Sequence, residues 1–340
     1  MLEVYPDYYK EFACLGGTCP DTCCAQWEVV VDDDTAALYA SVPGELGEKL
    51  RDTLTLDEDG DRILKFAEGR CPLLTGAGLC GVQKALGHGA LCKTCREFPR
   101  LCQDYTLFRE HSLSLSCPEA ARLILLAPRL PVLEVSGQEE PTEEPEFDLR
   151  DLSLLRETRE FLFSLLASQD LPLARRLALC LEAAGLAQAR LDGEPAPASA
   201  PGPEPLLWDP HGFRDLFRSM DILSAEWSAL LGLPLMQGTP DPFLQYPQIF
   251  SNFCHDAFYR NLFCAVADFD LLPRVQAAVA ACLLCRDLAL ARGGSRESLL
   301  RTMVLYDREV EHCADNRDAL LDACCKAPFL SPAALLGRLL

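Results

Sequence analysis

The stretch Cys14-Leu15-Gly16-Gly17-Thr18-Cys19-Pro20-Asp21-Thr22-Cys23-Cys24 opens a part of the chain that is unusually rich in cysteine. The first 117 residues hold ten of the 18 cysteines: Cys14, Cys19, Cys23, Cys24, Cys71, Cys80, Cys92, Cys95, Cys102 and Cys117. Thiolates at such short, irregular spacings can bind a metal ion or an iron–sulfur cluster. We therefore expect residues 1–133 to form an irregular, cysteine-rich region that a bound metal holds together.

The composition narrows the class of protein. A chain of 340 residues, 49% of them hydrophobic, is long enough for about two domains with a buried core. Its formal net charge of −20 argues against a nucleic-acid partner, because binding to phosphates requires clustered lysines and arginines.

No segment of the sequence indicates export or a membrane. Residues 1–10 lack the basic start and apolar run of a signal peptide. No stretch approaches about 18 consecutive apolar residues, the length that a membrane-spanning helix needs. We expect a cytoplasmic protein without a membrane partner, and in that reducing compartment cysteines act as metal ligands or small buried hydrophobes rather than as disulfides.

The rest of the chain predicts a mainly α-helical protein. Residues 134–150 contain an acidic run with two prolines, which is typical of a linker. Apolar residues recur at helical spacing over 151–192, and the break at Asp170-Leu171-Pro172 predicts a helical hairpin. Residues 193–206 are rich in proline and predict a second linker. Residues 207–340 predict a helical C-terminal domain, with helices over about 211–231, 243–266, 272–292 and 295–322.

The spacing of the first cysteines leaves their ligand roles open. Cys19 and Cys23 would share one face of a helix, whereas Cys24 would lie about 100° further round. The vicinal pair therefore indicates a second site or a spare thiol beside the metal. Four thiolates can bind either zinc or an iron–sulfur cluster, and the usual ferredoxin spacings are absent.

The other cysteines and the remaining motifs favour structural roles. Cys180, Cys254, Cys264, Cys282, Cys285, Cys313, Cys324 and Cys325 lie in apolar helical contexts and are expected to pack as small hydrophobes. The run Gly76-Ala77-Gly78-Leu79-Cys80-Gly81 matches a dinucleotide-binding pattern, but no apolar strand precedes it, so it predicts a turn that presents Cys80. We interpret His255 and His312 as surface or hydrogen-bonded histidines rather than as catalytic bases.

Several motifs together resemble the flagellin lysine-N-methylases. They are the stretch 12–27 followed by Val31-Asp32, Cys71-Pro72-Leu73-Leu74 with Gly78-Leu79-Cys80, Thr94-Cys95-Arg96-Glu97-Phe98-Pro99-Arg100, and Ser112-Leu113-Ser114-Leu115-Ser116-Cys117-Pro118-Glu119. Ser295-Arg296 and Glu311-His312 with Asn316 look like the family's C-terminal helical part. The resemblance implies transfer of a methyl group from S-adenosylmethionine to lysine ε-amines of flagellin, with an iron–sulfur cluster of the 4Fe-4S kind.

The resemblance also implies a set of metal ligands. The candidates are Cys14, Cys19, Cys23, Cys24, Cys71, Cys80, Cys95 and Cys117, and it leaves out Cys92 and Cys102. Eight thiols exceed the four that one cluster needs, and zinc remains an alternative. The cysteines alone are also compatible with a non-catalytic zinc- or iron-chelating module that binds another protein, or with electron transfer.

Overall fold

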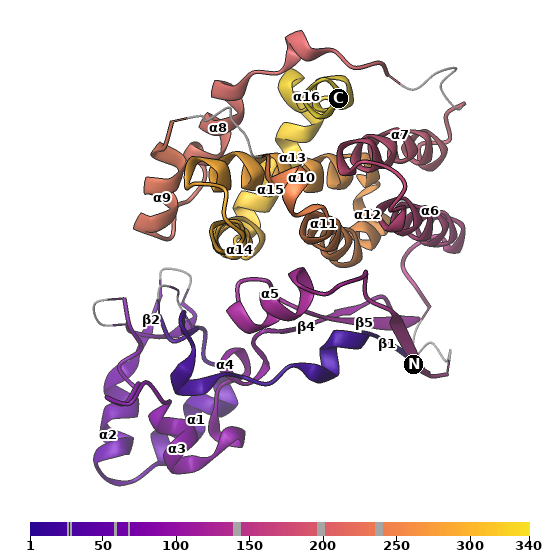
Figure 1. The fold of residues 1–340 in the computed structure, drawn as a ribbon. Coiled ribbons are helices and arrows are strands. Elements are labelled where there is room, and N and C mark those ends of the chain that lie inside the picture. The colour runs from indigo at the N-terminus through magenta and orange to yellow at the C-terminus, as the bar shows by residue number, and fades with distance from the viewer. Residues whose placement is uncertain are drawn as a thin grey trace.

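A helical domain lies above a sheet and a small cysteine-bearing lobe (Figure 1). The structure is a computed structural model and describes residues 1–25, 27, 29–57, 60–66, 69–138, 144–195, 201–234 and 241–340. Parts of the two predicted linkers, residues 139–143 and 196–200, lie outside the described residues.

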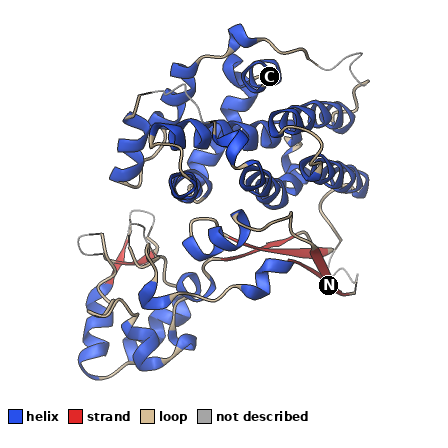
Figure 2. Cartoon of the chain, viewed as in Figure 1, coloured by secondary structure: helices blue, strands red, loops and turns tan. Residues whose placement is uncertain are grey.

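The prediction of a mainly α-helical protein is confirmed (Figure 2). The helices after the sheet are α6 (Leu149–Ala167), α7 (Leu173–Leu191), α8 (Pro210–Ser219), α9 (Ala225–Gly232), α10 (Pro242–Gln245), α11 (Pro247–Asn261), α12 (Ala265–Asp268), α13 (Leu271–Ala291), α14 (Arg296–Tyr306), α15 (Ala314–Lys326) and α16 (Pro332–Leu339). Within the described part of the chain, no helix is both long and apolar enough to cross a membrane.

Three of the predicted helices are interrupted, and the segment 243–266 divides into α10, α11 and α12. The segment 211–231 forms α8 and α9, with a non-helical stretch before Ser224, whose side chain caps α9 by accepting from Trp227 N. The segment 295–322 contains α14 and α15, separated by a π-helical turn at Asp307–Glu311. Such turns insert a residue into a helix and are frequent at functional sites.

A four-stranded sheet, which the sequence did not predict, supports the helical domain. Its strands are β1 (Leu2–Pro6), β4 (Arg100–Asp104), β5 (Phe108–Leu113) and β6 (Leu133–Gly137), in the order β4-β5-β1-β6. β1 runs parallel to β5, and the other neighbours are antiparallel. The start of the predicted acidic linker is therefore strand β6, because its backbone pairs with β1.

The N-terminal region divides between two hydrophobic cores. The sheet residues Val4, Phe108 and Leu113 belong to the core of the helical domain, as does helix α5 (Pro118–Leu125). The small lobe has its own core. Its elements are α1 (Asp33–Ser41), α2 (Gly44–Thr53), β2 (Leu54–Leu56), β3 (Arg62–Leu64), α3 (Gly81–Leu86) and α4 (Lys93–Glu97). The predicted region 1–133 thus contains a lobe and a sheet that serve different cores.

Most cysteines of the helical domain pack as predicted. Five of them are buried: Cys180, Cys254, Cys282, Cys285 and Cys324. The prediction is wrong for Cys325, which is exposed because it follows Cys324 on α15 and so points to another side of the helix. All 18 cysteines are free thiols.

A buried ion pair joins the sheet to the helical hairpin. Arg159 of α6 donates two hydrogen bonds to the Glu110 carboxylate of β5, over 2.5 Å and 2.7 Å. The side chains are only 8% and 2% exposed. The guanidinium also lies 3.6 Å from the ring centroid of Phe263, so the charge is surrounded by an anion and an aromatic face.

We predict that Arg159→Leu destabilises the protein by about 3–5 kcal/mol, because it leaves the Glu110 carboxylate buried without a counter-charge. The double variant Arg159→Leu/Glu110→Leu should recover most of that loss. Urea unfolding followed by circular dichroism measures both. A single variant within about 1 kcal/mol of the parent protein would show that the pair does not support this interface.

Candidate functional site

Five cysteines meet in the core of the small lobe. Cys71 and Cys92 are buried core members, and Cys24, Cys80 and Cys95 pack against the same core. They come from different backbone segments, which the fold joins by hydrogen bonds such as that from Cys71 N to Cys24 O, 2.8 Å long. We call this set the inner cysteine group.

Local structure explains how these segments meet. The residues from Thr75 to Leu79 form a tight turn with Gly78 at a φ of 72°, and the chain returns to start α3 directly after Cys80. This is the turn that the sequence predicted. The Asp32 carboxylate accepts from Thr35 N at the start of α1 and from Lys93 N at the start of α4, which fixes the segment that carries Cys92 and Cys95. These hydrogen bonds lower the pKa of Asp32 to about 2.

A second set of thiols lies where the N-terminal loop meets helix α5. Burial raises the pKa of the Cys117 thiol, and the neighbouring Cys19 and Cys14 raise it further. Cys14 also raises the pKa of Cys19, after burial, which is the main cause. We call Cys14, Cys19 and Cys117 the outer cysteine group.

The vicinal pair connects the two groups. Cys23 interacts with Cys14 and Cys117 of the outer group, whereas Cys24 packs in the core of the small lobe. A contact between the two thiols lowers the pKa of Cys24 to about 6 and raises the pKa of Cys23. The loop itself is not the α-helix on which the expected positions of Cys19 and Cys23 were based. It forms a short 3-10 turn at Gly16–Thr18, and Gly16 adopts a φ of 56°.

The donor chemistry of the inner group suits zinc or an iron–sulfur cluster, since all its members are free thiols. In residues 1–340 apart from the gaps given above, no three His, Cys, Asp or Glu side chains already stand in a metal-binding arrangement. Cys92, which the family resemblance leaves out of the ligand set, is a core member of this group. Its C-x2-C spacing to Cys95 was the signal that could have included it. Cys102 is exposed on β4.

The π-helical turn at Asp307–Glu311 lies between the cysteine loops and the helical domain. Asp307 is 1% exposed and accepts hydrogen bonds from Ser114 Oγ at 2.8 Å, Ser116 N at 2.7 Å and Arg260 Nη1 at 2.6 Å. Burial alone would raise the pKa of Asp307, but Arg260 and then His312 hold it below its ordinary value. His312 is hydrogen-bonded as expected, with its Nε2 2.6 Å from Ser114 Oγ.

The next residue of the turn reaches the cysteine loop. Arg308 is buried and donates to the Asp21 carboxylate over 2.7 Å, and Arg301 of α14 binds the same carboxylate. The Arg308 guanidinium also lies 5.4 Å from the ring centroid of Trp27. Because Asp21 lies between Cys19 and Cys23, these contacts fix the loop that joins both cysteine groups.

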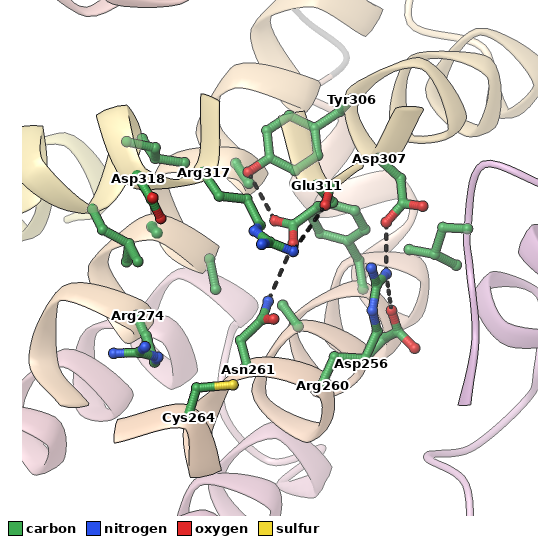
Figure 3. Close-up of a pocket in the computed structure, with 18 of the residues that line it drawn as sticks. Asp256, Arg260, Asn261, Cys264, Arg274, Tyr306, Asp307, Glu311, Arg317 and Asp318 are labelled. Atoms are coloured by element: carbon green, nitrogen blue, oxygen red, sulfur yellow. Dashed lines mark hydrogen bonds and ion pairs between the residues drawn. The ribbon is translucent and has the colours of Figure 1, made fainter. Parts of the chain in front are cut away.

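A cavity of about 320 Å³ lies on the other side of the turn, between α11, α13 and α15 (Figure 3). Asp256, Arg260 and Asn261 line it from one face of α11, and Tyr306 and Glu311 line it from the end of α14 and the turn. Burial raises the pKa of Asp256 to about 7, although the adjacent Arg260 opposes this. Asp256 can therefore exchange a proton near neutral pH.

Curated proteins from Salmonella are similar in sequence to part of this chain. It is 37% identical over 129 residues to the flagellar biosynthetic protein FliU of Salmonella muenchen, in a match that covers 36% of this chain and 76% of FliU. It has the same identity over the same length to lysine-N-methylases of Salmonella typhimurium and Salmonella choleraesuis. That match covers only 32% of those two proteins, so the chain spans about a third of their length. No family model matches the chain, and no solved structure does.

The class of protein follows from the match that covers most of FliU. The chain belongs to the family that contains FliU and these lysine-N-methylases. The resemblance that the cysteine motifs indicated is confirmed.

We predict that Asp21→Asn lowers the free energy of unfolding by about 2 kcal/mol at pH 7, because it removes a partly buried charged acceptor of two arginines. Arg308 and Arg301 outweigh burial and lower the pKa of Asp21 in the folded protein. Its contribution is therefore present above the unfolded pKa of about 4 and is lost as the pH falls through the lower folded value.

Urea titrations from pH 7 to pH 3 measure this effect, with Asp33→Asn as the matched control. Asp33 pairs with Arg62, but its side chain is 88% exposed, so its loss should change little. Equal stabilities of the Asp21→Asn and Asp33→Asn proteins at pH 7 would contradict the role given to Asp21.

Proposed function

We propose that the protein is a protein-lysine N-methyltransferase that uses S-adenosylmethionine to methylate flagellin in the cytoplasm, with an iron–sulfur cluster in its N-terminal lobe. The observation that carries this proposal is the membership in a family with proteins named lysine-N-methylase and FliU. The structure adds a cavity lined by carboxylates and guanidinium groups, which suits a small charged ligand.

The reaction requires a neutral lysine amine. The ε-amine has an ordinary pKa of about 10.4, so it must lose a proton before its nitrogen lone pair can attack the methyl carbon. The carbon–sulfur bond of the sulfonium then breaks, and its electrons return to sulfur, which gives S-adenosylhomocysteine and a methylated ammonium. Asp256 is suited to accept the first proton, because its pKa of about 7 lies near the working pH and it lines the cavity.

The inner cysteine group supplies the thiols for the metal centre. Cys24, Cys71, Cys80, Cys92 and Cys95 give one more thiol than a 4Fe-4S cluster or a zinc ion needs. When bound, the metal would cross-link loops that are otherwise held by a small core and a few hydrogen bonds, and its binding free energy would stabilise the folded lobe. The ion pairs of Asp21 with Arg301 and Arg308 would then connect the stabilised lobe to the helical domain.

We predict that anaerobically purified protein contains iron and sulfide and, with S-adenosylmethionine, adds methyl groups to lysines of flagellin from the same cell. Cys71→Ser should lose most of the metal, because it removes a buried thiol of the inner group. Cys102→Ser, at an exposed strand position, should retain both metal and activity. Metal analysis, the absorption spectrum and mass spectrometry of flagellin measure these outcomes.

The possible results separate the alternatives. Zinc in place of iron would overturn the cluster but leave the methyltransferase proposal intact. Metal-loaded protein that methylates no flagellin lysine would favour a non-catalytic chelating module. Loss of metal from Cys102→Ser but not from Cys71→Ser or Cys95→Ser would contradict the inner group as the binding set.

A further inference from the structure

The cavity between α11, α13 and α15 exists because small side chains line it. Ala277, Ala278 and Ala281 recur at helical spacing along α13, and Ala257 lines the cavity from α11. Two buried aromatic residues, Phe253 and Tyr306, also border it. The walls therefore leave room for an organic ligand, and the volume of about 320 Å³ lies at the lower end of the range of small-molecule sites, about 300–1,000 Å³.

Some of the charged residues at the cavity already neutralise one another. Arg260 binds both Asp256 and Asp307. Arg274 donates two hydrogen bonds to Asp268, over 2.9 Å and 2.5 Å. These five side chains form two internal ion networks and have little charge left for a ligand.

Three other charged residues at the cavity have no ion-pair partner among the residues that the structure describes. Arg317 donates only to the backbone oxygen of Glu311, over 3.3 Å. The Glu311 carboxylate accepts from two neutral groups, Asn261 Nδ2 at 3.2 Å and the Tyr306 hydroxyl at 3.4 Å. Asp318 follows Arg317 on α15 and also lines the cavity. The cavity thus offers one guanidinium and two carboxylates, and Figure 3 shows Arg317 and Glu311 extending into the same space from different segments.

We propose that this cavity binds S-adenosylmethionine through its amino-acid end and its sulfonium. Arg317 would face the carboxylate of the ligand, and Glu311 and Asp318 would face its two cationic centres, the ammonium and the sulfonium. This assignment rests on the proposed methyltransferase function, and it identifies the site of the methyl donor.

The charge pattern distinguishes the donor from the substrate lysine. A lysine side chain carries one positive charge and no negative charge, so it would leave Arg317 facing a like charge. S-adenosylmethionine carries one negative and two positive centres. They equal the three unpaired protein groups in number and are opposite to them in charge. Charge complementarity of this kind favours the correct ligand and penalises the wrong one.

Isothermal titration of the intact, metal-loaded protein with three ligands tests the assignment. S-adenosylmethionine is compared with its decarboxylated form, which lacks the carboxylate, and with S-adenosylhomocysteine, which lacks the sulfonium charge. Arg317→Ala should weaken the binding of S-adenosylmethionine at least about tenfold, because it removes one charge-assisted hydrogen-bonded contact. It should leave the affinity for the decarboxylated form unchanged, because that ligand has no group for Arg317 to bind.

The carboxylates are tested in the same way. Asp318→Asn and Glu311→Gln should each lower the affinity for S-adenosylmethionine. In at least one of these variants, the affinity for S-adenosylmethionine should fall by a larger factor than the affinity for S-adenosylhomocysteine. Asp315→Asn is the matched control, since Asp315 is an exposed acid on the same helix that does not line the cavity. Thermal melting and metal content confirm that each variant is folded.

The outcomes distinguish the two proposals. If Arg317→Ala binds both forms of the donor as the parent protein does, the cavity assignment fails and the proposed function stands. If Arg317→Ala weakens the binding of the decarboxylated donor as much as that of the intact donor, the arginine does not bind the carboxylate and the assignment also fails. If the metal-loaded parent protein binds none of the three ligands, the methyltransferase function itself is contradicted.

Discussion

The buried carboxylate of Asp307 is the constraint on which the arrangement of this protein depends. A carboxylate that is 1% exposed is costly unless several donors surround it. Here the donors come from both sides of the molecule, from Ser114 and Ser116 after strand β5 and from Arg260 of α11. The segment that leads to Cys117 and helix α11, which lines the cavity, therefore bind the same anion. If either moved, the carboxylate would become exposed or would lose a hydrogen-bond donor.

The π-helical turn extends this constraint in several directions. Its residues do not share one face, so successive side chains reach different parts of the structure. Arg308 reaches Asp21 in the cysteine loop, and Glu309 accepts from Leu223 N at 2.7 Å, before the start of α9. Glu311 lines the cavity. One short turn thereby connects the proposed metal lobe, the helical domain and the proposed donor site, which gives a physical reason for a cysteine-rich lobe in the proposed methyltransferase.

The sequence was most informative where interactions are local. Helical periodicity identified the hairpin of α6 and α7 and the long helix α13, because these follow from neighbouring residues alone. The sheet was missed because β1 pairs with β5 about 100 residues away, and short strands carry little periodic signal. The stretch Asp307–Glu311 is mostly charged and looks like an exposed helix, yet its first four residues are buried by partners that only the tertiary fold brings together. For the cysteines, composition and motifs gave the candidate set, but the division into two groups and the place of Cys92 depend on how distant loops meet.

Hydrogen–deuterium exchange of Asp307→Asn tests the central claim most directly. If this carboxylate joins the two halves, exchange should become faster at once in two distant segments, residues 114–121 beside the outer cysteine group and residues 256–264 along the cavity, while α6 and α7 stay protected. Faster exchange restricted to the turn itself, or to only one of the two segments, would show that Asp307 does not couple them.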